Sequence, residues 1–139
     1  MKNKSTLVLM EQMIMILVFA LTAALCLKAF VQADRISLKT ERQTQASFLA
    51  QNAAETMKAC RGDLETAAQM LDGQIIGDTL QIRYDRKGIP VKENDTHTFL
   101  LQITKTTVPA PGGDLGAAEV CVSAVGDPLL TLQILWRAS

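Results

Sequence analysis

Residues 13–27 read MIMILVFALTAALCL, and the interpretation of the whole chain begins from this stretch. It contains no charged residue, and Thr22 is its one polar residue. Extended back to Leu7, the run would form a helix of about 31 Å, enough to cross a bilayer core of about 30 Å. No second stretch of this kind occurs in the sequence, so we expect a single membrane-spanning helix.

The charges around this segment bear on its orientation. Lys2 and Lys4 precede it, which favours a cytoplasmic N-terminus and places the remaining chain outside the cytoplasm. Basic residues at positions 28, 35, 39 and 42 follow the segment and oppose that orientation. A cleaved secretory signal is the alternative, because Val31-Gln32-Ala33 offers small residues for a signal peptidase and the chain would then begin at Asp34. The apolar run is long for a signal, so we favour a retained anchor.

The first part of the chain contains no helix breaker, since the first Gly is Gly62 and the first Pro is Pro90. After Ala46, apolar residues recur every three or four positions and so share one face of a helix. They are Leu49, Ala53, Met57, Cys60, Leu64, Ala67 and Leu71. We therefore expect one continuous helix over residues 7–59. An anchor followed by a flexible stalk and a separate helix is the alternative.

The tripeptide Arg61-Gly62-Asp63 interrupts the helical pattern. Gly62 can end a helix, and Asp63 is a favourable N-cap for a second helix over residues 64–71. Asp72-Gly73 would end that helix. Arg-Gly-Asp is also the integrin-adhesion tripeptide, which requires an exposed loop tip. We favour the capping interpretation.

The rest of the chain alternates apolar and polar residues in short runs, which is typical of antiparallel strands with one buried face. Turns are expected at residues 85–88 and 126–128, and a loop at residues 109–114. The expected strands cover residues 80–84, 89–91, 99–104, 118–124 and 130–137, and Pro90 makes 89–91 an edge strand. The predicted fold class is therefore α+β, a long N-terminal helix packed on a small antiparallel sheet.

The composition argues against catalysis, metal binding and nucleic-acid binding. Fourteen basic residues balance fourteen acidic ones, so no excess positive charge indicates a nucleic acid. One His and three Cys are too few for most zinc or Cys–His chemistry, and we expect no metal, no cofactor and no enzymatic activity. We expect His97 to be solvated surface. Cys60 and Cys121 would lie on opposed faces, so we do not expect a disulfide between them.

Residues 5–11 (STLVLME), followed by an aliphatic span and a breaker-free helix, resemble the N-terminus of type IV pilins and of the pseudopilins of type II secretion and competence machines. In that family a prepilin peptidase removes a short basic leader. The fifth residue of the mature chain is a Glu that pairs with the N-terminal amine of an adjacent subunit. The resemblance implies cleavage between Thr6 and Leu7 and gives Glu11 this assembly role. Thr6 stands where the family normally has Gly or Ala, and Leu7 where it usually has Phe.

The resemblance implies four regions: a leader (1–6), an anchor (7–30), an extracytoplasmic amphipathic helix (31–60) and a module of short helix and sheet (61–139). It implies a minor pilin or pseudopilin, a structural subunit of a pilus, competence or secretion filament at the cell surface. Its partners would be other pilin-like subunits, the membrane and a prepilin peptidase. The alternative function is a single-pass anchored binding or accessory domain that does not polymerise.

Overall fold

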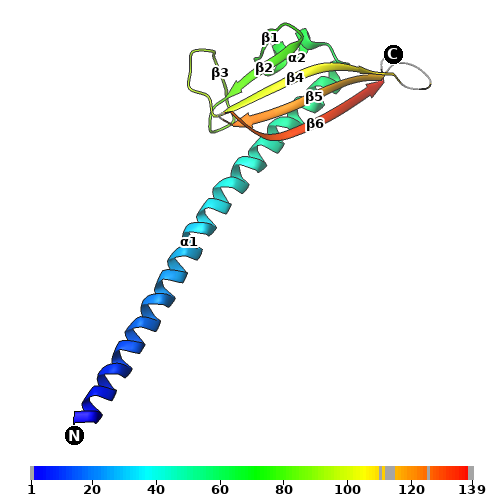
Figure 1. The fold of residues 1–139 in the computed structure, drawn as a ribbon. Helices are drawn as coiled ribbons and strands as arrows, with labels where there is room; N and C mark the ends of the chain where they lie inside the picture. Colours follow the sequence, from blue (N-terminus) through cyan, green and yellow to red (C-terminus); the bar gives the residue numbers. More distant parts are fainter. Residues whose placement is uncertain (1, 110, 112–114, 125, 138–139) are drawn as a thin grey trace. The chain divides into compact units, whose positions relative to one another are not determined.

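The structure is a computed structural model that describes residues 2–109, 111, 115–124 and 126–137. Two helices are followed by six strands along the chain (Figure 1). The helices are α1 (Lys2–Ala59) and α2 (Leu64–Leu71). The strands are β1 (Gln74–Ile76), β2 (Thr79–Tyr84), β3 (Pro90–Val91), β4 (Phe99–Val108), β5 (Leu115–Ala124) and β6 (Asp127–Arg137).

The chain divides into two compact units, residues 1–41 and residues 42–139. The first unit consists of the N-terminal part of α1, and its described side chains from Asn3 to Glu41 are all exposed. The prediction of one continuous helix is confirmed, because α1 runs without a break to Ala59. The helix begins at Lys2 rather than at Leu7, since residues 2–6 include no breaker.

The second unit contains a six-stranded sheet in which all described pairs are antiparallel. The strands lie in the order β1-β2-β4-β5-β6, and β3 also pairs with β2, beside β1. The longest pairing joins β4 to β5, from Phe99 opposite Ala124 to Val108 opposite Leu115. One edge of the sheet is therefore shared by β1 and β3, and β6 forms the other edge.

Alternate strand residues face the helices and form the core, as the sequence pattern predicts. Strands β2, β4 and β5 contribute Leu80, Ile82, Tyr84, Phe99, Leu101, Ile103, Val120 and Val122, all at most 3% exposed. The C-terminal part of α1 packs on this face through its predicted stripe. Three further alanines, Ala46, Ala50 and Ala54, are buried and widen that stripe.

The connection from α1 to α2 confirms the capping interpretation. Arg61 and Gly62 both have positive φ, 52° and 81°, and the Gly62 N–H donates to the carbonyl of Met57 at 3.0 Å. This is the Schellman arrangement that satisfies the last carbonyls of a helix. The Asp63 carboxylate then accepts from the N–H of Glu65 and caps α2. Gly62 is buried while Arg61 and Asp63 are exposed, and the tripeptide ends α1 and caps α2.

The sheet is larger than expected at several places. Strand β1 was not predicted; it forms a short hairpin with β2 through Gly77, whose φ is +64°. Strand β4 continues to Val108, and β5 starts at Leu115, because the two strands go on pairing beyond the buried part of the sheet. Asp127 and Pro128 belong to β6 rather than to a turn. The predicted loop at residues 109–114 lies largely outside the described residues, at positions 110 and 112–114.

The indole of Trp136 lies directly against two glycines from distant parts of the unit. A Cβ added at Gly62 would lie 2.3 Å from a ring carbon of Trp136, and one added at Gly116 would lie 2.2 Å from its ring nitrogen. Both distances are far below van der Waals contact, so the ring occupies the space that a side chain would need. The end of α1 and strand β6 are thus held together through Trp136.

We predict that Gly62→Ala is far more destabilising than Gly77→Ala. Both glycines have positive φ, which costs an alanine about 1 kcal/mol. Gly77 has open space around it, whereas an alanine at residue 62 must also displace Trp136, at about 1–3 kcal/mol more. Chemical unfolding of the full chain in detergent, followed by the fluorescence of its one Trp, measures both losses. Equal losses for the two variants would contradict the close contact.

Candidate functional site

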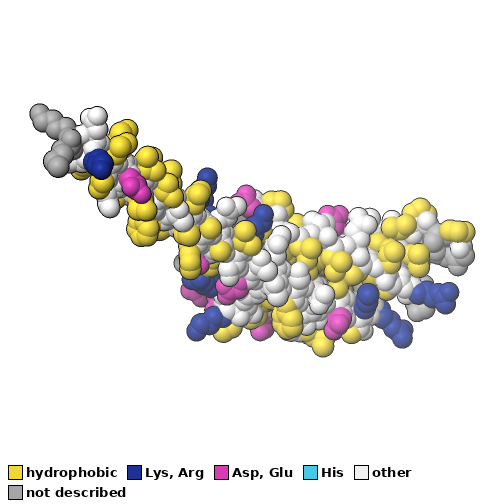
Figure 2. Space-filling model, turned by 90° about the horizontal axis from the view of Figure 1, so that it is seen from below, with side chains coloured by type: hydrophobic (Ala, Val, Ile, Leu, Met, Phe, Trp, Pro, Cys, Tyr) yellow, Lys and Arg dark blue, Asp and Glu magenta, His cyan; other side chains and the backbone are white. Residues whose placement is uncertain are grey.

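The N-terminal part of α1 carries the residues that the sequence singled out for function. It is the one helix among the described residues that is long and apolar enough to cross a membrane. Its large apolar side chains are exposed on every side of the helix. The exposed fraction is 65% at Leu7, near the start of the apolar run, and 76% at Phe30, near its end. Figure 2 shows hydrophobic side chains along much of the visible face of this helix. Such a surface fits lipid or other apolar helices.

Glu11 lies inside this apolar surface as a helical residue. The positions one turn away on the same face are Leu7, Val8, Ile14 and Met15, all apolar and 57–65% exposed. A carboxylate in an apolar environment is costly unless it is paired or reaches the interface. No neighbour one turn away on its own helix offers a positive charge. The arrangement can therefore accept a cation that comes from another molecule.

Thr6 and Leu7, the predicted processing site, lie in α1 about one turn before Glu11. In a helix Leu7 and Glu11 are one turn apart and face the same side. Thr22, the polar residue within the apolar run, donates its hydroxyl to the carbonyl of Val18 at 2.8 Å. This bond within the helix satisfies the one hydroxyl of residues 13–27, as a lipid environment requires.

Cys60 and Cys121, the two cysteines outside the anchor, are not in contact with each other. The Cys60 thiol donates to the Met70 sulfur at 3.6 Å, on the helix-bearing side of the sheet. The Cys121 sulfur instead accepts from the Thr131 hydroxyl at 3.8 Å, in a row of residues that faces away from the helices. Both thiols are free, in the opposed positions that strand alternation predicts.

His97 is half-buried between β3 and β4. Among the residues that the structure describes, no three His, Cys, Asp or Glu side chains come together as metal ligands. The expectation of a solvated His97 is thus only partly met, because the residue is partly rather than fully exposed.

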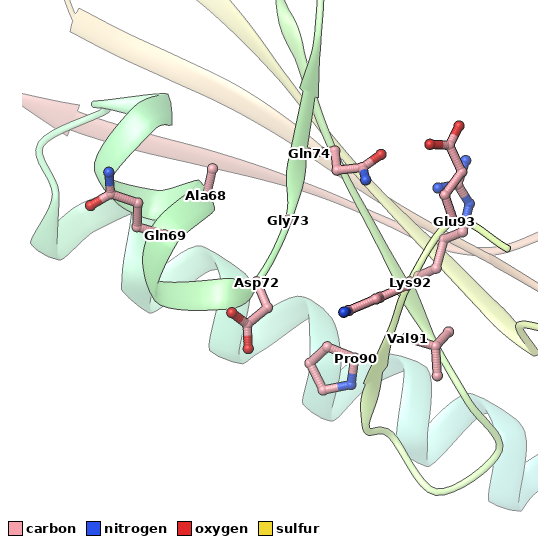
Figure 3. Close-up of a pocket in the computed structure, with 10 residues that line it drawn as sticks. Ala68, Gln69, Asp72, Gly73, Gln74, Pro90, Val91, Lys92 and Glu93 are labelled. Carbon is pink, nitrogen blue, oxygen red and sulfur yellow. The ribbon is translucent and has the colours of Figure 1, made fainter. Parts of the chain in front are cut away.

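A cavity of about 550 Å³ lies between α2 and the edge of the sheet shared by β1 and β3. In Figure 3 the Lys92 side chain extends from beside β3 toward Asp72 at the end of α2. The described residues that line it include no Cys, His, Ser or Thr; they are Ala68, Gln69, Asp72, Gly73, Gln74, Arg83, Pro90, Val91, Lys92 and Glu93. The lining can bind a small polar molecule through charges of both signs. Sequence reasoning missed this cavity.

Two titratable groups of the second unit have shifted pKa values. Burial raises the pKa of Tyr84 to about 12, and the negative charge of Asp72 adds to the shift. The hydrogen bond from the Thr66 hydroxyl, together with the bond from the Glu65 N–H, lowers the pKa of the Asp63 carboxyl. Both shifts follow from the fold of the core and of the α2 cap.

Comparison with protein families, with characterised proteins and with solved structures finds no match for this chain.

We predict that Tyr84 makes the second unit sensitive to alkali. The phenol has a pKa of about 12 in the fold against 10.0 in the unfolded chain, so folding favours its neutral form. The resulting stability is complete below pH 10 and is lost as the pH rises toward 12. Tyr84→Phe should flatten this decline by up to about 1 kcal/mol per pH unit, reduced where water reaches the ring. Urea unfolding at pH 9, 10 and 11 measures the slopes; parallel slopes for both proteins would contradict the prediction.

Proposed function

We propose that this protein is a pilin-like structural subunit, a minor pilin or pseudopilin, of a cell-envelope filament. The observation that carries the proposal is Glu11, a carboxylate surrounded on its own helix face by exposed apolar side chains. As an isolated anchor the helix would gain nothing from this charge. In a filament, the charge would specify the position of a neighbouring helix through its N-terminal amine.

The proposed assembly uses the apolar helix twice. Before assembly, residues 7–30 anchor the chain in the membrane, with the sheet-bearing unit outside the cytoplasm. During assembly, the same exposed aliphatic side chains pack against the helices of neighbouring subunits, which present a surface as apolar as lipid. Removal of residues 1–6 would supply the amine at Leu7 that pairs with Glu11 of an adjacent subunit.

A single-pass accessory domain that does not polymerise is the second candidate function. Two observations favour it: Thr6 occupies the position before the proposed cut, and the cavity beside α2 is large enough for a small ligand. In this case the leader stays on the chain, and Glu11 marks the edge of the membrane.

We predict that Glu11→Gln removes the protein from filaments but not from membranes. Loss of the charge leaves the amine of the neighbour unpaired in an apolar contact, which should lower incorporation about tenfold or more. Tagged variants expressed in the native cell are separated into sheared filaments and membranes, and the chain is measured in each fraction. Gln12→Ala, at the adjacent polar residue, is the matched control and should assemble normally.

Moving the charge by one position sharpens the test. Glu11→Gln combined with Gln12→Glu keeps the composition of the helix and turns the carboxylate about 100° around its axis. This double variant should fail to assemble as Glu11→Gln does. Assembly of all variants at the level of the unchanged protein would rule out the pairing. Absence of the unchanged protein from filaments would favour the accessory domain.

The intact mass of the chain from its native membranes tests the processing step. A mass for residues 7–139, with or without a methyl group, supports prepilin-type cleavage. A mass for residues 1–139 supports the plain anchor, and a chain that begins at Asp34 excludes both functions.

A further inference from the structure

The two edges of the sheet differ sharply in how well they are protected against pairing with another strand. One edge is divided between β1, of three residues, and β3, of two residues including Pro90. The other edge is β6, an unbroken strand of eleven residues. Short strands and prolines are devices by which proteins block sheet edges. We propose that the open edge of β6 pairs antiparallel with β6 of a second copy of this chain.

The sequence of β6 leaves most of its edge open. Its charged residues are Asp127 at one end and Arg137 at the other, with none between them. The one Pro is Pro128, and the adjacent Leu129 has no partner in β5, because the register shifts there. The devices that block pairing thus lie at the two ends of β6, and residues 130–136 carry none.

The hydrogen-bonding pattern of the sheet determines which backbone groups of β6 face the open edge. The Asp85 N–H donates to the carbonyl of Ile89 at 2.9 Å, so odd-numbered residues of β2 bond toward β3. In antiparallel sheets bonding alternates along each strand, and the registers carry this alternation through β4 and β5 to β6. The N–H and C=O groups of Thr131, Gln133 and Leu135 therefore point to the open edge, where a second strand can bond to them.

Two antiparallel copies of β6 are complementary in their hydrogen-bonding groups and in their charges. With Leu132 opposite Leu132 of the second copy, Thr131 lies opposite Gln133, and both belong to the outward-bonding set. The same register brings the acidic end of each strand, at Asp127, beside the basic end of the other, at Arg137. A parallel pairing would instead place like charges together. The charge pattern thus selects the antiparallel second copy as the occupant.

The second copy would also cover apolar surface that the chain itself leaves open. Leu130 and Leu132 are only partly buried, whereas their partners in β5, Val122 and Val120, are fully buried. Leu135, on the other face of the sheet, is 55% exposed. A neighbouring strand adds side chains beside both faces. The interface is small, so the pair is expected to be transient and to depend on concentration.

The pair is independent of the proposed filament. Antiparallel pairing of identical strands requires a two-fold axis normal to the sheet. This axis reverses the direction of residues 42–59 of α1 between the copies, whereas the filament proposed above requires parallel anchors. The pair therefore joins second units whose residues 42–59 run in opposite directions. Glu11→Gln should leave it unchanged.

A cross-link across the axis tests the register. In the full chain, solubilised in detergent with Cys26, Cys60 and Cys121 changed to Ala, we introduce Leu132→Cys or Leu135→Cys. In the proposed register, residue 132 of one copy and residue 132 of the other form a non-hydrogen-bonded pair. Their Cα atoms would be about 4.5 Å apart, within the range of a disulfide. Leu132→Cys should give a covalent dimer on mild oxidation, and Leu135→Cys, three residues from the axis, should not. Equal yields from both, or no dimer from either, would overturn the register.

The unmodified chain provides a second test that needs no cysteine replacement. Light scattering in detergent should show a monomer that becomes a dimer as protein concentration rises. Gln133→Pro removes an N–H that faces the open edge and should weaken association about tenfold or more, without loss of a bond inside the chain. Gln133→Ala is the matched control and should dimerise. A chain that stays monomeric at every concentration, or a dimer indifferent to Gln133→Pro, would show that β6 does not pair with itself.

Discussion

The second unit depends on the packing of the C-terminal part of α1 on the sheet, and alanines form much of the buried surface of that helix. Four alanines of α1, at positions 46, 50, 53 and 54, are at most 6% exposed. They belong to the same buried cluster as large side chains that the strands supply, among them Phe99, Leu101 and Ile103. Small residues on the helix and large ones on the sheet let the two surfaces interlock without cavities. A larger side chain at any of these alanines would push the helix away and overpack the core.

The same contact explains why burial decreases toward the edges of the sheet. Strands β2, β4 and β5 lie beneath the helices, and their inward side chains are almost completely buried. The inward side chains of β6, such as Leu130 and Leu132, lie at the margin and are only partly covered. A helix is narrower than a six-stranded sheet, so one edge remains less covered than the centre.

Features with a local, periodic signal could be predicted from the sequence. The stripe from Leu49 to Leu71 follows the helical period, and the strand faces follow the period of two, so both were assigned correctly. The Asp63 cap was also recognisable, because its partners lie within three residues. Strand β1 was missed, since its Gln-Ile-Ile run is too short to show an alternation and is held only by β2.

The candidate functional residues also fall into two groups: those that the sequence shows and those that only the fold brings together. Glu11 could be identified because a carboxylate within an apolar run is visible in the sequence, whereas its partner belongs to another molecule and stays a prediction. The cavity beside α2 could not be predicted, because Asp72, Arg83 and Lys92 come together only through the pairing of both β1 and β3 with β2. The opposed positions of Cys60 and Cys121 could be predicted from the helical period around Cys60 and the strand alternation around Cys121.

The contact of Trp136 with Gly62 has a consequence for the order of folding. The strands of the sheet are joined mostly by short hairpins and can pair as soon as each has been synthesised. Gly62, just after the end of α1, however, packs against the indole of Trp136, which lies near the C-terminal end. Until that end has been made and has crossed any membrane, the unit lacks its final contact. A chain truncated before β6 would therefore expose the end of the helix and the open side of β5, and would be a natural substrate for proteases.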